Sequence, residues 1–426
     1  MEASVESTKH SEEEPPWPEL LGGKSWEGLL NPLNLSLRRL ILRCGDLCQA
    51  TCDAFNNDQN SKYAGSSRYG KNSFFKKVMF DAAAARYHVR FFLYATAKLS
   101  LGEAIFLHSL SRNSWDRESN WIGYIAAATD EASAASGRRE IYIVWRGTAR
   151  MYEWIDVIGD RPEPAEELLR PKSWEKKESN SSINSDDDDG DGDDTVPKVM
   201  NGWLTIYVSD DPNSPFTKLS ARAQILKAIA AMRDQYKSEN LSIILTGHSL
   251  GACLAILSAL DLTENIAGDI PVTAIVFGSP QVGNNAFKER IEEHPNLKIL
   301  QVRNMIDVIP LYPGGLLGYA DVGVELVVDN RKSPSLKDSK NPGDWHNLQA
   351  LLHTVAGWNG AEGEFELKVE RSLALVNKSS AIVRDEFLIP ASWWVEKNKG
   401  MVLDENGDWV LTPPTEEDFP VVPEEL

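Results

Sequence analysis

The sequence predicts an α/β protein that has a mostly parallel central sheet with helices on both faces. The first observation is a regular alternation of apolar strand-like runs and helical segments between residues 216 and 303. Strands that alternate with helices at this spacing are typical of βαβ units, whose strands are parallel. The second is an apolar strand at 241–246 that passes through a tight turn into an apolar helix at 250–262. The third is size, since 426 residues of which 42% are apolar can bury one large core.

The predicted elements begin with an amphipathic helix and three strands. Apolar residues at helical spacing predict a helix over 35–55. β-Branched and aromatic residues predict strands over 88–99, 121–128 and 140–146. The remaining predicted elements are helix 216–238, strand 241–246, helix 250–262, strand 272–277, helix 284–293, strand 298–303, strand 322–328, helix 346–358 and helix 366–377.

These elements predict a single domain over 35–392 with appendages. Residues 1–34 begin acidic and end in a stretch rich in Pro, Trp and Gly, which predicts a disordered tail. Residues 163–196 predict an exposed acidic insertion, because they include seven Asp between Asp186 and Asp194 and almost no apolar residue after Trp174. Turn residues near 398–400 and 406–407 predict a small β appendage within 393–426, followed by an acidic tail.

The net charge of −19 is concentrated in these acidic appendages, so the rest of the chain is nearly neutral. No basic patch is visible, and nucleic acid is therefore not expected as a partner. The sequence contains no run of 18 apolar residues, so no transmembrane helix is predicted. The acidic start lacks the apolar core of a signal peptide. With only four cysteines, the sequence predicts a cytoplasmic protein with reduced thiols.

The strongest local signal is Gly-His-Ser-Leu-Gly at 247–251, between the strand at 241–246 and the helix at 250–262. This is the G-x-S-x-G pattern in the strand–turn–helix context of a nucleophilic serine. The two glycines leave room for a tight turn that presents the Ser249 hydroxyl at the positive end of the helix. The alternative is a strand-to-helix turn in which Ser249 only caps the helix.

A nucleophilic serine needs a base, and in this pattern the acid and the histidine follow the serine along the chain. Three histidines follow Ser249. His294 ends a predicted helix before the preferred acid, and His353 falls inside a predicted helix, where a packed core histidine is the alternative. His346 follows a loop that leads into a helix, so His346 is the preferred base.

The preferred acid is Asp307, which comes directly after the strand predicted at 298–303. That position places it at the carboxyl edge of the sheet, where catalytic groups gather in open α/β sheets. The alternative is a turn-capping aspartate. Other acids after the serine are Asp261, Asp321, Asp329 and Asp338.

An oxyanion hole is also required for acyl transfer, and the H-G-G-G form is absent from the sequence. The strand predicted at 140–146 ends at Gly147 and Thr148. We expect the backbone N–H and hydroxyl of Thr148, with the backbone N–H of Leu250, to point at the developing oxyanion.

At these motifs the sequence resembles the class 3 lipases, a group of α/β-hydrolases, over most of residues 80–360. Five motifs carry the resemblance in chain order: WRGT at 145–148, GHSLG at 247–251, VFGSPQVGNNAF at 276–287, RNMIDVIP at 303–310 and HNLQALLH at 346–353. The segments WEGLLNPLNLSLRRLI at 26–41 and VNKS at 376–379 resemble the cytosolic class II branch of plant phospholipases A1. Two departures are the Asp run at 186–194 and Ala350, where an aromatic residue is common.

The resemblance implies a Ser249–His346–Asp307 triad, with Thr148 as an oxyanion donor. It implies a serine acylhydrolase that cleaves the sn-1 ester of glycerolipids at a lipid interface, with transient membrane contact. A mono- or diacylglycerol lipase or a galactolipid lipase is the alternative of the same chemistry, and a catalytically idle lipid-binding module is the alternative of another class.

After the oxyanion segment the sequence predicts a short amphipathic helix. Its apolar positions i, i+3, i+4 and i+7 are Met151, Trp154, Ile155 and Ile158. In the resembled lipases this segment is a lid over the acyl groove. The alternative is a permanently packed surface helix, which has the same pattern.

No cofactor and no metal are expected. The sequence has no H-E-x-x-H and no C-x-x-C motif. Asp187, Asp189 and Asp191 begin like a calcium loop, but Lys198 occupies the twelfth position, where such loops have Glu. We therefore expect the Asp run to be a solvated loop.

Overall fold

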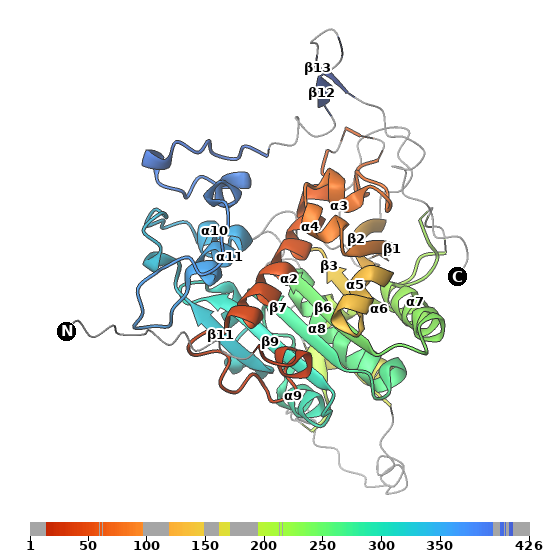
Figure 1. The fold of residues 1–426 in the computed structure, drawn as a ribbon. Coiled ribbons are helices and arrows are strands. Elements are labelled where there is room, and N and C mark those ends of the chain that lie inside the picture. The colour runs from red at the N-terminus through yellow and green to blue at the C-terminus, as the bar shows by residue number, and fades with distance from the viewer. Residues whose placement is uncertain are drawn as a thin grey trace, which may run out of the picture.

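The computed structural model describes residues 14–96 without 59 and 62, 119–148, 162–170, 195–394 without 213 and 215, 401–403, 405, and 409–411. Its centre is a seven-stranded sheet in the order β1-β2-β3-β6-β7-β9-β11 (Figure 1). The strands from β3 to β11 run parallel, whereas β1, β2 and β3 pair antiparallel. The mostly parallel sheet is thus confirmed. Its strands are β1 Tyr87–Thr96, β2 Ser119–Ala128, β3 Arg139–Trp145, β6 Leu241–His248, β7 Val272–Phe277, β9 Leu297–Asn304 and β11 Val324–Val328.

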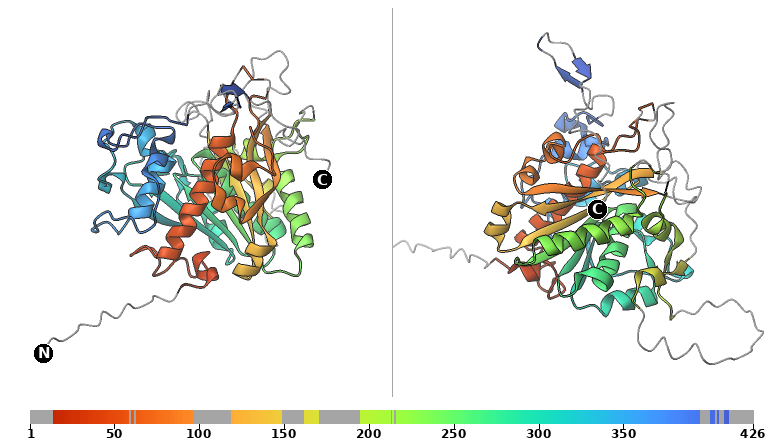
Figure 2. Two further views of the ribbon diagram at one scale, coloured as in Figure 1. Left: turned by 45° about the horizontal axis from the view of Figure 1, so that its top comes forward. Right: turned by 90° about the vertical axis from the view of Figure 1, so that its right-hand side faces the viewer.

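Helices cover both faces of this sheet, as predicted (Figure 2). Alternate side chains of a strand point to opposite faces, and here both sets are apolar. Ile243 and Leu245 of β6 pack on one face, whereas Ile244 between them packs on the other. The face of Ile243 is covered by α6 Asn201–Val208, α7 Ala221–Gln235, α8 Leu250–Leu262 and α9 Asn285–Glu292. The face of Ile244 is covered by α2 Leu35–Ala54, α3 Phe74–Lys77 and α11 Leu348–Gly357. The remaining short α-helices are α1 Trp17–Leu20, α4 Asp81–Ala84, α5 Asp130–Ser136 and α10 Pro342–Trp345.

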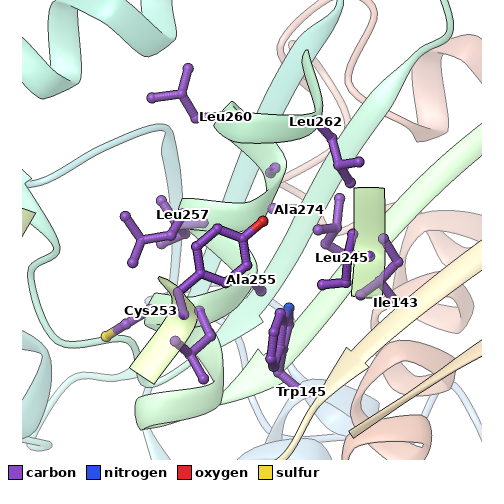
Figure 3. Packing of buried hydrophobic residues seen from close by; sticks show 14 of the residues in the cluster. Ile143, Trp145, Leu245, Cys253, Ala255, Leu257, Leu260, Leu262 and Ala274 are labelled. Atoms are coloured by element: carbon purple, nitrogen blue, oxygen red, sulfur yellow. The ribbon is translucent and has the colours of Figure 1, made fainter. Parts of the chain in front are cut away.

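Helix α8 lies at the centre of the larger core cluster, and every one of its residues is buried. Figure 3 shows Leu257, Leu260 and Leu262 of this helix in one buried cluster with Ile143, Trp145 and Leu245 of the sheet. The Trp145 indole N–H donates to Ser258 Oγ of α8 at 2.9 Å, which satisfies the one polar atom of that ring. Among the described residues, the segment Leu250–Ala267 is the one helix long and apolar enough to cross a membrane, but 89% of it is buried inside the protein. Its hydrophobicity is therefore accounted for by the core.

A second, four-stranded sheet has the order β10-β8-β5-β4. The acidic insertion was expected over 163–196, but β4 Pro162–Pro164 pairs with β5 Lys198–Met200. The first residues of that range therefore belong to the folded domain and not to an exposed loop. Leu168, in the 3₁₀-helix Glu166–Leu168, is fully buried in the core. The residues between 171 and 194, including the Asp run, lie outside the described part. The other two strands are β8 Gly283–Asn284 and β10 Tyr319–Ala320.

The expected disordered tail is wrong from residue 14 to residue 34. Leu21 and Trp26 are 3% and 1% exposed and belong to the same core cluster as α2. The Trp26 indole N–H donates to Leu20 O at 2.9 Å, and Thr273 of β7 donates to Leu21 O at 2.8 Å. The acidic composition of the first residues led to the prediction of disorder, although Leu21 and Trp26 are buried in the core. Residues 1–13 lie outside the described part.

The helix predicted at 366–377 is also wrong, since the structure has only a 3₁₀-helix at Leu373–Lys378. The N–H groups of Glu366 and Lys368 donate to Gly357 O and Ala356 O at the end of α11, at 3.1 and 2.9 Å. These residues satisfy carbonyls that a helix leaves unpaired at its C-terminus, instead of forming a helix themselves. Farther on, β12 Met401–Leu403 pairs with β13 Trp409–Leu411, in the segment where a β appendage is predicted.

Candidate active site

Ser249 occupies the turn between β6 and α8. Its backbone lies at φ 59° and ψ −126°, a strained conformation for a residue with a side chain. The neighbouring glycines explain why the turn can form. A Cβ on Gly247 would lie 2.1 Å from Gly251 O, and a Cβ on Gly251 would lie 2.7 Å from Trp145 O. The structure therefore has the strand–turn–helix geometry that the G-x-S-x-G pattern predicts.

His346 and Asp307 form a buried pair at the carboxyl edge of the same sheet. The His346 Nδ1–H donates to Asp307 Oδ2 at 2.5 Å, and the two residues are 2% and 3% exposed. Asp307 follows β9, and its other oxygen accepts the backbone N–H of Ile309 at 3.0 Å. His346 lies in the link between α10 and α11. The carboxylate thus holds the ring in one orientation and leaves the other ring nitrogen, Nε2, available.

Two buried atoms in this region have no hydrogen-bond partner, Ser249 Oγ and His346 Nε2. Buried polar atoms are rarely left unpaired, because each costs about 1–3 kcal/mol. A hydroxyl and an imidazole nitrogen that both lack partners are suited to transfer a proton between themselves during a reaction.

Gly278 lies against the His346 ring. A Cβ at this position would lie 2.8 Å from His346 Cε1 and 3.4 Å from Asp307 Oδ2. Gly278 also has φ +54°, which favours glycine. The glycine of the VFGSP segment therefore gives the His346–Asp307 pair its space. This role is not apparent from the sequence, because Gly278 and His346 are distant along the chain.

His248, the residue before Ser249 in the turn, is a second neighbour of His346. The two rings pack with centroids 4.6 Å apart. Burial, with the nearby His346 as a smaller cause, lowers the pKa of His248 well below its usual value. The neutral ring therefore donates its Nε2–H to the backbone carbonyl of His346 at 3.0 Å. His248 thus holds the backbone that carries His346.

The expected oxyanion donors, Thr148 and Leu250, lie on two segments that approach each other beside Ser249. Leu250 is the first residue of α8, so its N–H has no acceptor within the helix. A Cβ on Gly147 would lie 2.7 Å from His248 O and 3.8 Å from Ser249 Cβ, which shows how closely the segment before Thr148 passes the turn. Backbone N–H groups in this position can stabilise negative charge on a carbonyl oxygen.

Arg146 supports this segment from inside the protein, although sequence reasoning gave it no role. Its guanidinium donates to Trp121 O and Gly147 O, both at 3.0 Å, and lies 3.7 Å from the centroid of the Phe55 ring. Burial lowers the pKa of Arg146 to about 10. Among the residues that the structure describes, no carboxylate pairs with it. Arg146 thus holds the carbonyl of the residue that precedes Thr148.

The other candidate bases and acids have partners of their own. His353 bonds Ser333 Oγ at 2.8 Å inside α11, and His294 bonds Glu264 Oε1 at 2.9 Å. The remaining acids also have partners: Asp261 bonds Arg222, Asp321 bonds Gln281, Asp329 bonds Arg331 and Asp338 bonds Lys340. Among the described residues, His346 pairs with Asp307 and with none of the other candidate acids.

The predicted lid residues Met151, Trp154, Ile155 and Ile158 lie outside the described residues. So do the Asp residues of the possible calcium loop. Within the described residues, no group of three or more His, Cys, Asp or Glu side chains is arranged to hold a metal ion.

A mostly parallel sheet with a serine at its strand–helix elbow, and a buried His–Asp pair at the same edge, defines the α/β-hydrolase class of serine esterases. A family model described as lipase (class 3) matches residues 142–316. Phospholipase A1-IIdelta from Arabidopsis thaliana is 59% identical over 406 residues, covering 95% of this chain and 98% of that protein. Phospholipase A1-II 5 from Oryza sativa subsp. japonica is 52% identical over 416 residues, covering 96% and 85%. The chain belongs to the class 3 lipase family, alongside these phospholipase A1-II proteins, and is a carboxylic ester hydrolase.

Among solved structures, the chain is similar to the Rhizomucor miehei lipase in its native propeptide complex. The identity is 19% and the TM-score 0.38, over 68% of this chain and 77% of that chain.

Proposed function

We propose that the protein is a phospholipase A1-type acylhydrolase that cleaves the sn-1 ester of glycerolipids, with Ser249, His346 and Asp307 as its catalytic triad. The observation that carries this proposal is the buried His346–Asp307 pair, whose free Nε2 lies at the same sheet edge as the unpartnered hydroxyl of Ser249. The substrate class is supported by two relatives, phospholipases A1-II that are 59% and 52% identical to this chain.

In the first half of the reaction, Ser249 Oγ attacks the ester carbonyl while His346 Nε2 accepts its proton. Asp307 stabilises the imidazolium through the Nδ1–H bond. The N–H groups of Leu250 and Thr148 stabilise the negative carbonyl oxygen of the tetrahedral intermediate. The intermediate collapses when His346 donates the proton to the leaving alcohol oxygen, which leaves the acyl group on Ser249.

In the second half, water attacks the acyl-enzyme and His346 Nε2 accepts the proton of the water. The second tetrahedral intermediate then collapses and releases the fatty acid, while His346 Nε2 returns the proton to Ser249 Oγ. Every step uses groups of this chain, and the proposal needs no metal or cofactor.

We propose further that the protein acts in the cytoplasm, at a lipid interface that it contacts transiently. Three of the four cysteines, Cys44, Cys48 and Cys253, are buried and form no disulfide. Burial raises the pKa of Cys44 to about 12, so this thiol stays protonated and unreactive. Buried thiols that form no disulfide suit a reducing compartment.

The lid hypothesis also remains a proposal. An apolar helix face at Met151, Trp154, Ile155 and Ile158 would gain a partner at a lipid surface. We expect Trp154→Ser to lower hydrolysis of aggregated lipid about tenfold more than hydrolysis of a short soluble ester. Equal losses on both substrates, measured below and above the aggregation threshold, would leave only a packed surface helix.

The test of the central proposal is Ser249→Ala. Ester hydrolysis should fall on the order of 10⁶-fold with little change in melting temperature, because the nucleophile is removed from an intact fold. A fluorophosphonate should label the wild type but not the variant, and an unlabelled wild type would indicate an idle lipid-binding module. A panel of phospholipids, mono- and diacylglycerols and galactolipids, with positional analysis of the released fatty acid, distinguishes the alternative substrates.

A further inference from the structure

The loop that follows β9 has an unusual concentration of exposed apolar side chains. Large apolar residues of a soluble domain are normally buried, and a cluster of exposed ones indicates an interaction surface. We call the exposed side chains of residues 305–317 the apolar rim; they are Met305 (49% exposed), Val308 (50%), Leu311 (58%), Leu316 (105%) and Leu317 (47%). The other large apolar side chains that are exposed in the described part lie singly or in pairs elsewhere: Leu35, Met79, Leu367, Phe387 and Leu388.

The apolar rim lies directly beside the candidate active site. Met305 and Val308 flank Asp307 along the chain, and Asp307 bonds His346. The rim continues through the 3₁₀-helices Ile309–Leu311 and Gly315–Leu317, which follow β9 at the carboxyl edge of the sheet. A partner surface that binds the apolar rim therefore lies next to the candidate active site.

Hydrogen bonds hold the rim in shape while its side chains remain in water. The N–H of Gly314 donates to Gln281 Oε1 at 2.9 Å, and the N–H of Gln281 donates to Tyr312 O at 2.8 Å. The N–H of Leu317 donates to Gly314 O at 3.0 Å. Because the backbone is already ordered, little conformational entropy is lost when the leucines are buried by a partner.

The charge of the segment identifies the kind of partner. Between Asn304 and Ala320 the only charged side chain is Asp307, and it is buried against His346. One cation touches the rim, since Arg331 Nη2 lies 3.8 Å from Met305 Sδ, but Arg331 is paired with Asp329 at 2.7 Å. Without an unpaired cation the rim has no strong attraction for anionic headgroups, and its apolar contacts suit a zwitterionic bilayer. An uncharged, preformed apolar rim around an ester-hydrolysing site fits a neutral or zwitterionic lipid surface.

We propose that the apolar rim docks the protein on a zwitterionic lipid surface, with Leu316 and Leu317 inserted between the headgroups. This proposal rests on the proposed function, since a lipid ester is the reason to bring this edge to a membrane. It concerns residues separate from the predicted lid, and Leu316, the most exposed of them, is the leading anchor.

The test is binding of the full chain with Ser249→Ala to phosphatidylcholine vesicles, measured by flotation. Adding Leu316→Ser and Leu317→Ser should lower the vesicle-bound to free ratio at least about tenfold, because two leucines lose their apolar contact with lipid. The matched control adds Phe387→Ser and Leu388→Ser, an adjacent pair with 42% and 87% exposure outside the rim, and should change the ratio less than about twofold. Binding of the Ser249→Ala chain should be nearly insensitive to salt, because no charge pair is involved.

The active chain supplies the second readout. With Leu316→Ser and Leu317→Ser, hydrolysis of phosphatidylcholine vesicles should fall while hydrolysis of a short soluble ester is unchanged. A wild type that hydrolyses neither substrate contradicts the proposed function, whereas vesicle binding still tests the rim by itself. The docking proposal is overturned if the chain with Leu316→Ser and Leu317→Ser binds vesicles normally, or if binding requires anionic lipid. It is also overturned if these substitutions lower hydrolysis of the soluble ester as much as hydrolysis of vesicles. It is also overturned if light scattering shows a dimer that the leucine substitutions dissociate, since a second copy would then cover the rim.

Discussion

His346 and His353 lie seven residues apart, both are buried, and yet their surroundings give them different chemistry. His346 is in the link before α11, where Asp307 accepts its Nδ1–H and its Nε2 has no partner. His353 is inside α11, where its Nε2 bonds Ser333 Oγ and its ring packs on Phe365 with centroids 5.1 Å apart. Burial, with the positive Arg371 nearby, lowers the pKa of His353 to about 4. Each ring keeps one buried nitrogen without a partner, so the difference is the carboxylate: Asp307 orients His346 as a base, whereas His353 has none and is a neutral core residue.

The largest effect expected from this difference is on turnover. His346→Ala should lower ester hydrolysis by roughly 10⁴-fold or more, because Ser249 loses its base. His353→Ala should leave turnover per folded molecule nearly unchanged and lower the free energy of unfolding by about 1–3 kcal/mol, since a packed ring and a buried hydrogen bond are lost. Steady-state kinetics and urea unfolding of both variants measure the two effects. If the two phenotypes are exchanged, His353 is the base and our assignment is wrong.

A smaller effect tests how closely the His346 ring is positioned. Gly278→Ala places a methyl group 2.8 Å from His346 Cε1, so the ring must shift away from its present position. We expect kcat to fall about 100-fold, because a displacement of about 1 Å in a catalytic group has effects of this size.

The matched control for Gly278→Ala is Gly268→Ala. Gly268 has a similar φ of +59°, but a Cβ there meets nothing within 4 Å. An alanine there has the cost of a positive φ, about 1 kcal/mol or more, without the contact to His346. Equal losses of kcat in both variants, measured at matched folded fractions, would show that strain and not the displaced ring lowers activity.

The smallest effect concerns the pH dependence of stability at His353. Its pKa is about 4 in the folded protein and about 6.5 when unfolded. Between these values the unfolded chain binds more protons, so stability is complete above about pH 6.5 and is lost as the pH falls toward 4. The loss from this residue reaches at most about 3 kcal/mol. His353→Gln, which can still bond Ser333, should flatten this part of the profile of unfolding free energy against pH. An unchanged slope would assign the acid lability to other groups.

Much of the fold was predictable because its signals are local. The run from β6 to β9 alternates buried strands with helices, and each boundary lies near a turn or capping residue. The failures occurred where distant contacts outweighed local composition. Leu21 and Trp26 pack on the core in spite of their acidic, proline-rich surroundings, and residues 366–368 bond to the end of α11 instead of forming a helix.

The candidate site shows the same division. Ser249 was predictable because the glycines around it and the strand before it are adjacent in the sequence, and Asp307 because it directly follows a strand. The supporting roles of Arg146 and Gly278 were not, because they depend on Trp121, Phe55 and His346, which are distant along the chain.

The sequence by itself determined the α/β architecture, the serine at the elbow and the short set of residues that could serve it. These follow from hydrophobic periodicity and from the few residue types that a tight turn accepts, both of which are local properties. Only the tertiary structure decided which histidine faces an aspartate. That choice depends on bringing β9 and the segment before α11 to one edge of the sheet, where a hydrogen bond of 2.5 Å joins residues 39 positions apart.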